Sequence, residues 1–135
     1  MRTCFIIVLC ISLVGCATMH MLGAENRQSI ANLSKGMDKE QVIDYMGETY
    51  IWDMGVQINN PYRIEMLQGT SKNFEVFYYY TGIKRADFEI TNEELTPLVF
   101  ENGKLSGWGW AFLNEVISKN NIQINQPSKR KRRES

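Results

Sequence analysis

Apolar residues recur every three or four positions in two short stretches of the N-terminal half, which is the spacing of one helical face. They are Ile30, Leu33 and Met37 in the first stretch and Val42, Ile43 and Met46 in the second. Asp38 followed by Gln41 has the pattern of a capping box at the start of the second helix. Gly47 stands where a left-handed C-cap is expected. The pattern therefore predicts two short helices joined by a turn at Lys35-Gly36.

The period changes after Gly47, where aromatic and β-branched residues dominate. Residues 49–58 predict a strand or an ordered loop, and Tyr62, Ile64 and Met66 alternate with charged neighbours. Asn102-Gly103 is the preferred dipeptide of a type I′ hairpin turn, so the strands on either side of it should pair antiparallel. The clearest predicted strands are residues 74–81, 98–100 and 104–108.

Residues 111–119 have helical spacing and close the folded part of the chain. The order of elements predicts an α+β domain over residues 29–119, with two short N-terminal helices packed on a 3–4-stranded antiparallel sheet and a C-terminal helix. Residues 16–28 are polar and small, which predicts a tether. Residues 120–135 are rich in Asn, Gln, Pro and basic residues, which predicts a disordered tail.

A short apolar run near the N-terminus ends in a cysteine. Residues 4–14 are an apolar stretch of 11 residues behind Arg2, the length of a signal-peptide core. A membrane span would need about 20 such residues. Leu13-Val14-Gly15-Cys16 resembles the lipobox of bacterial lipoproteins. An ordinary secretory signal cleaved nearby and a buried core strand are the alternatives.

The lipobox resemblance implies that residues 1–15 are a signal peptide and that Cys16 becomes an acylated N-terminus. Two or more acyl chains anchor a protein stably in a membrane. Ala17, rather than Asp, follows the cysteine, which in Gram-negative lipoproteins implies sorting to the outer membrane. We therefore expect a lipid-anchored protein of the cell envelope, on the periplasmic face of the outer membrane. Of the three cysteines only Cys16 would remain, so no disulfide or cysteine metal site is expected.

The formal net charge is zero but unevenly distributed. Between Cys16 and the tail, nine basic and 14 acidic residues give a body of about −5, whereas the last seven residues carry five basic groups and one acid. The basic residues are Lys129, Arg130, Lys131, Arg132 and Arg133. In an envelope lipoprotein they are candidate contacts for anionic head groups rather than for nucleic acid. A merely solvated tail is the alternative.

Two segments resemble known envelope lipoproteins. Residues 26–47, through Asn26-Arg27, Ile30, Leu33, Gly36-Met37, Gln41-Val42 and Met46-Gly47, resemble the opening of the SmpA/OmlA (BamE-like) family. Residues 95–110 are similar to a related group of bacterial lipoproteins of unknown function. The resemblance implies a helix-helix-sheet core on a lipid anchor and a non-enzymatic accessory role in inserting outer-membrane β-barrels. The stretch at 52–60, the terminal helix and the basic tail depart from that family.

Catalytic chemistry finds little support in the sequence. His20 is the only histidine and lies in the expected tether, so a nucleophile would lack its usual base. Asp87, Glu89, Glu93 and Glu94 cluster between two predicted strands but lack the Gly and ligand alternation of a calcium loop. We expect a solvated acidic turn, no cofactor and no metal.

The aromatic residues are the strongest functional lead. Along the strand at 74–81, Phe77 and Tyr79 share the face opposite Phe74, Val76, Tyr78 and Tyr80. If the helices cover the latter face, Phe77 and Tyr79, with Trp108 and Trp110, form a candidate protein-binding patch. If the terminal helix covers the second face, these residues are core. The sequence thus predicts a non-catalytic, lipid-anchored binding module with an envelope protein partner. A small inhibitor or ligand-binding lipoprotein is the alternative, as is a cell-wall hydrolase using Glu93 or Glu94.

Overall fold

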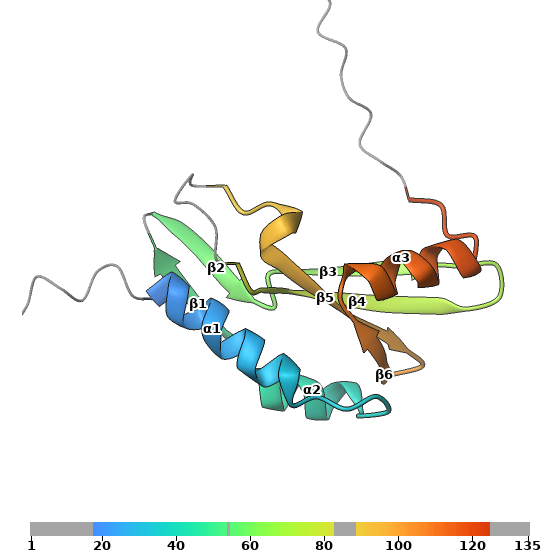
Figure 1. The fold of residues 1–135 in the computed structure, drawn as a ribbon, viewed down its shortest axis with the longest axis horizontal. Coiled ribbons are helices and arrows are strands. Elements are labelled where there is room, and N and C mark those ends of the chain that lie inside the picture. Colours follow the sequence, from blue (N-terminus) through green and yellow to red (C-terminus); the bar gives the residue numbers. More distant parts are fainter. Residues whose placement is uncertain (1–17, 54, 83–88, 125–135) are drawn as a thin grey trace, which may run out of the picture.

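The computed structural model describes residues 18–53, 55–82 and 89–124 (Figure 1). The expected signal peptide, Cys16, Asp87 and the basic residues 129–133 therefore lie outside the described residues.

Helices and two antiparallel sheets make up the described chain, which confirms the α+β fold (Figure 1). The helices are α1 (Thr18–Ala31), α2 (Lys39–Met46), the 3₁₀ helix η2 (Asn92–Glu94) and α3 (Trp110–Lys119). A two-stranded hairpin contains β1 (Thr49–Asp53) and β2 (Val56–Asn60). The main sheet has the order β3-β4-β5-β6, with β3 (Arg63–Gln68), β4 (Asn73–Tyr80), β5 (Leu95–Glu101) and β6 (Lys104–Trp108).

Local signals placed several element boundaries correctly. Asp38 and Gln41 form the predicted capping box of α2, and Gly47 ends the helix with a φ of 77°. Asn102 and Gly103 both have positive φ, 51° and 74°, as a type I′ turn between β5 and β6 requires. These features depend on residues close together in the chain, so the sequence alone specifies them.

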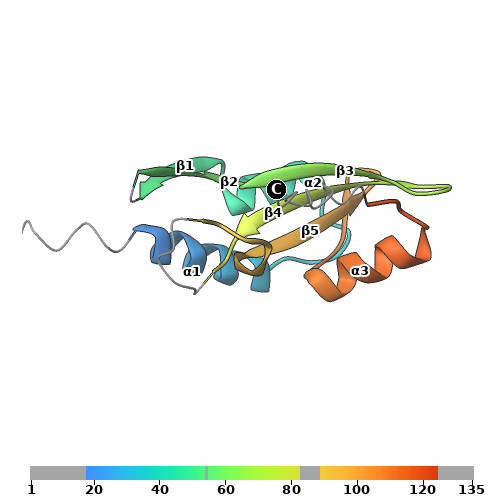
Figure 2. The same cartoon turned by 90° about the horizontal axis from the view of Figure 1, so that it is seen from above.

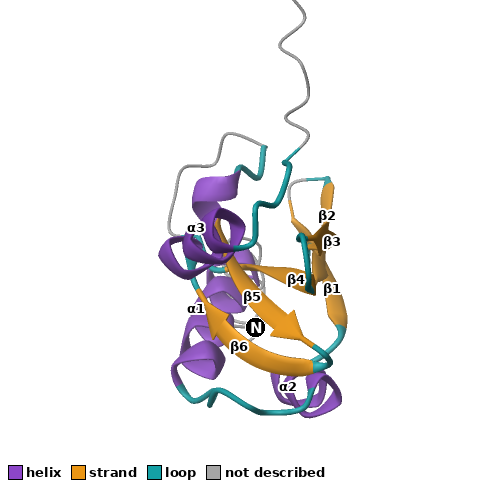
Figure 3. Ribbon diagram, turned by 90° about the vertical axis from the view of Figure 1, so that its right-hand side faces the viewer, coloured by secondary structure: helices purple, strands orange, loops and turns teal. Residues whose placement is uncertain are grey.

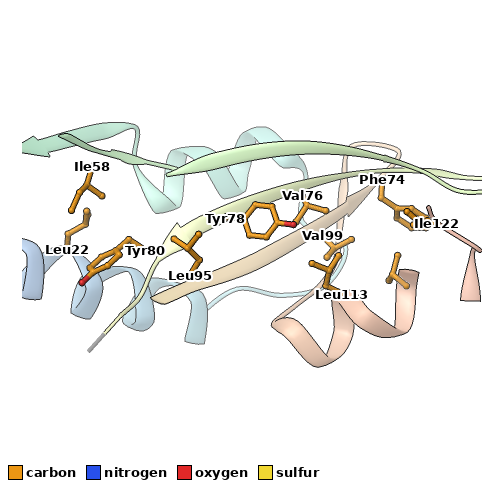
Figure 4. Close-up of a cluster of buried hydrophobic side chains, with 11 residues drawn as sticks. Leu22, Ile58, Phe74, Val76, Tyr78, Tyr80, Leu95, Val99, Leu113 and Ile122 are labelled. Carbon is orange, nitrogen blue, oxygen red and sulfur yellow. The ribbon is translucent and has the colours of Figure 1, made fainter. Parts of the chain in front are cut away.

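Both faces of the main sheet are covered by helices, with α3 on one face, α2 on the other and α1 contributing to both clusters (Figure 3). On one face α3 packs its buried Leu113 and Val116 against a cluster that includes Phe74, Val76 and Val99 (Figure 4). On the other face α2 packs Val42 and Met46, together with Ile30 of α1 and the following Leu33. The sheet residues buried there are Phe77, Tyr79, Leu98, Phe100 and Leu105. The strongly apolar β4 therefore lies between two helical layers.

The expected tether at residues 18–28 is wrong, because this stretch forms most of α1. Leu22 is 5% exposed and packs near Ile58 and Tyr80 (Figure 4). The polar Asn26, 2% exposed, occupies the buried side of the same helix. Because a buried asparagine interrupts the apolar pattern, the sequence did not show an amphipathic helix here. Within the described residues, the folded domain thus begins at Thr18 rather than at residue 29.

Buried amides fix α1 to the rest of the molecule. Asn26 Nδ2 donates to Asn60 Oδ1 (2.9 Å) and to the backbone oxygen of Tyr80 (2.8 Å). Asn60 Nδ2 in turn donates to the carbonyl oxygens of Met46 (3.1 Å) and Gly47 (3.2 Å). These bonds join α1, the end of α2, the end of β2 and the end of β4. A neutral polar network of this kind is stable in the interior because its donors are satisfied.

The end of α3 is also more ordered than the sequence predicted. Disorder was expected from residue 120, yet Ile122 is 7% exposed and packs in the cluster that contains Phe74 (Figure 4). The amide of Thr70 donates to the carbonyl of Asn120 (3.0 Å), which attaches this segment to the β3–β4 turn. Within the described residues, no helix is long and apolar enough to cross a bilayer.

Candidate functional site

The predicted aromatic patch at Phe77 and Tyr79 is wrong, because both side chains are core. Phe77 is 3% exposed and Tyr79 is fully buried beneath the N-terminal helices. The alternative prediction was that Phe77 and Tyr79 are buried by the terminal helix. They are buried, but α3 covers the opposite face of the sheet. Since both faces of β4 are apolar, the strand pattern alone could not say which helices cover which face.

The two tryptophans lie on opposite faces and are half-buried. Trp110 packs against Tyr78, with 5.7 Å between ring centroids, and its indole N–H donates to the Leu95 carbonyl (2.7 Å). Trp108 packs at the margin of the cluster that contains Leu105. Neither belongs to an exposed apolar patch, so the predicted four-residue binding site is not brought together.

One edge of the main sheet is paired and the other is open. The turn before α2 runs along β6: the Gly36 amide donates to the Leu105 carbonyl (2.8 Å) and the Leu105 amide to the Met37 carbonyl (2.9 Å). β3, at the opposite edge, pairs within the described residues only with β4. A free edge offers unpaired backbone donors and acceptors to an incoming strand.

The side chains of β3 are reversed relative to a typical edge strand. Ile64 and Met66 point to solvent, 52% and 65% exposed. The charged residues point the other way, where the Arg63 guanidinium lies 4.1 Å from the Tyr78 ring centroid and the Tyr78 hydroxyl donates to Glu65 (2.8 Å). Burial, followed by the bond to Glu65, raises the pKa of Tyr78 to about 12. The alternation was visible in the sequence, but not that the apolar side faces water.

A shallow pocket of about 200 Å³ lies beside Met66. Glu75 and Phe100 contribute to its wall, and Glu75 forms an ion pair with Lys39 (3.0 Å). Pockets for small organic ligands are typically about 300–1,000 Å³. The pocket is therefore better suited to one side chain of a docked segment than to a free ligand.

The β1–β2 hairpin carries a second exposed apolar pair, Tyr50 and Trp52, which are 60% and 63% exposed. Their cross-strand partners are Asn59 and Gln57, so the four side chains share the outer face of the hairpin. The inner face, with Ile51 and Ile58, packs into the core near α1. Figure 2 shows the hairpin and β3 along one side of the molecule, with α1 and α3 beneath them.

The acidic residues do not assemble a metal site among the described residues. Glu94 is buried and accepts from the Thr91 amide (2.9 Å), so it caps η2. Glu89 is exposed, and His20 lies in α1 rather than in a tether. Asp87 lies outside the described residues.

These features define a small α+β domain with exposed apolar side chains on an edge strand and on a hairpin, among other positions. Residues 20–115 match the family model described as Protein of unknown function (DUF3192), and the chain belongs to that family. A comparison with curated proteins and one with solved structures returned no match.

Proposed function

We propose that the protein is a lipid-anchored, non-catalytic binding module of the bacterial cell envelope, with the open edge of β3 as its docking site. The free edge of β3, together with the exposed side chains of Ile64 and Met66, supports this docking site. An extended segment of a protein partner would add a strand beside β3. Backbone hydrogen bonds would supply affinity, and contacts with Ile64 and Met66 would supply specificity.

The N-terminal sequence supports the proposed place of action. The resemblance of Leu13-Val14-Gly15-Cys16 to a lipobox supports an acyl anchor, and Ala17 supports the periplasmic face of the outer membrane. The resemblance to the SmpA/OmlA (BamE-like) family supports a partner involved in assembling or maintaining that membrane. Both supports are independent of the open edge.

The proposal is tested by cross-linking at single positions in the native bacterium. A photoreactive residue at Met66 should give one discrete adduct with an envelope protein. The same residue at Met21, which is 55% exposed but lies in α1, should not. Identical adducts from both positions, or none from Met66, would refute the docking site.

The variant Ile64→Lys with Met66→Lys should abolish the adduct of a probe placed at the neighbouring Gln68. Both lysines would replace exposed side chains, so the free energy of unfolding should change by less than about 1 kcal/mol. Met21→Lys, at an exposed apolar position of α1, is the matched control and should leave the adduct intact. A urea denaturation curve confirms that each variant is folded.

A further inference from the structure

The outer face of the β1–β2 hairpin is uncharged and partly aromatic. Its four side chains, Tyr50, Trp52, Gln57 and Asn59, are two aromatic rings and two amides, none charged. Gln57 donates to Asn59 (2.8 Å), which leaves the amides partly satisfied by each other. The body around this face carries a net charge of about −5. Tyrosine and tryptophan, with apolar rings and one polar atom, favour the boundary between water and lipid.

The hairpin is attached to the first turns of α1. Ile51, Val56 and Ile58 on its inner face belong to the same cluster as Met19 and Leu22 of the helix. Ile58 and Leu22 point toward each other in the close-up (Figure 4). Figures 1 and 2 both place the turn of the hairpin and the start of α1 at the same end of the molecule. The inner face of the hairpin is therefore packed against the start of the helix.

The length of chain before α1 determines where that end of the molecule can be. α1 begins at Thr18, two residues after Cys16. Two residues span at most about 7 Å even when fully extended. Acyl chains on Cys16 would thus hold the start of α1 within about 7 Å of the bilayer surface, and would bring the hairpin to the same surface.

We propose that the outer face of the β1–β2 hairpin is a membrane contact, in which Trp52 and Tyr50 insert among the lipid head groups next to the anchor. This inference rests on the acyl anchor of the proposed function. The hairpin face would contact the lipid surface itself rather than another protein. The anchor would bring that surface to this end of the molecule, and the hairpin face presents no charge. The domain then lies against the membrane in one orientation, with the outer face of the β1–β2 hairpin toward the bilayer.

The test measures whether lipid reaches Trp52. The intact mass of protein purified from bacterial membranes is first measured by mass spectrometry, to establish that the chain starts at Cys16 and carries acyl groups. The protein is then reconstituted into phosphatidylethanolamine–phosphatidylglycerol vesicles, with or without bromine on the acyl chains near the head groups. Bromine quenches only indoles in contact with lipid. Trp108 and Trp110 are half-buried in the domain and serve as internal controls.

Acylated wild-type protein should lose up to about one third of its tryptophan emission in brominated vesicles, because one of three tryptophans is in contact with lipid. Trp52→Phe should lose none. Equal emission in both vesicles from protein of verified acylated mass would overturn the membrane contact and leave the anchor standing. Tryptophan emission that changes with protein concentration but not with bromine would indicate that the hairpin face contacts a second copy of the protein. That result would also overturn the membrane contact. An unmodified mass would overturn the anchor, and the membrane contact with it.

Discussion

The buried side chain of Tyr79 lowers the free energy of unfolding through its hydroxyl group. It is fully buried, and its hydroxyl finds no hydrogen-bond partner among the described residues. A buried polar group without a partner costs about 1–3 kcal/mol. The sequence placed this residue in an apolar strand but could not show that its hydroxyl would be left without a hydrogen-bond partner.

We expect Tyr79→Phe to raise the free energy of unfolding by about 1 kcal/mol, because the substitution removes the unpaired hydroxyl and keeps the ring. Urea denaturation at neutral pH measures it. A loss of more than about 1 kcal/mol would show that the hydroxyl has a partner in solution.

Three tyrosines of β4, Tyr78, Tyr79 and Tyr80, predict a loss of folding stability at alkaline pH. Burial raises the pKa of Tyr79 and of Tyr80 above the usual 10.0, and burial together with Glu65 raises the pKa of Tyr78 to about 12. The unfolded chain therefore ionises first. The stability is fully present below pH 10 and falls as the pH rises toward about 12. In Tyr79→Phe the fall between pH 10 and 12 should be shallower; an unchanged slope would mean that Tyr79 contributes nothing to it.

At the scale of elements, α1 depends on distant partners for its position. We expect Asn60→Ala to lower the free energy of unfolding by about 1–3 kcal/mol, because Asn26 loses an acceptor and the carbonyls at the end of α2 lose a donor. The amides of α1 should exchange hydrogen faster. Asn59→Ala, at the neighbouring exposed position, is the control and should change stability by less than about 0.5 kcal/mol. Equal effects from both variants would contradict a role for the buried network.

What the sequence could and could not predict follows from the range of the interactions. The α2 capping box and the Asn102-Gly103 turn are specified by residues within a few positions of each other, and both were predicted. α1 was missed because its buried face includes Asn26, whose partners Asn60 and Tyr80 lie 34 and 54 residues away. The candidate site was missed because an alternating strand looks the same at the edge of a sheet as in its middle.

At the scale of the whole molecule, the proposed acyl anchor on Cys16 would determine where the protein is located. We expect Cys16→Ser to move the protein from the membrane to the soluble fraction, because the substitution removes the sulfur that would carry the acyl chains. Cys10→Ser, within the predicted signal peptide, should leave the distribution unchanged. Cell fractionation with immunoblotting measures both. Retention of Cys16→Ser on membranes would remove the acyl anchor from the proposal.

The long-range attachment of α1 also sets an order of events in time. α1 comes first in the described chain, yet its polar contacts are with Asn60, Tyr80 and Thr81, which are synthesised much later. A 14-residue helix is marginal in water without such contacts. The segment next to Cys16 should therefore stay unfolded until β4 has formed. Removal of the signal peptide and attachment of lipid would have their opportunity in that interval, and completion of the fold would end it.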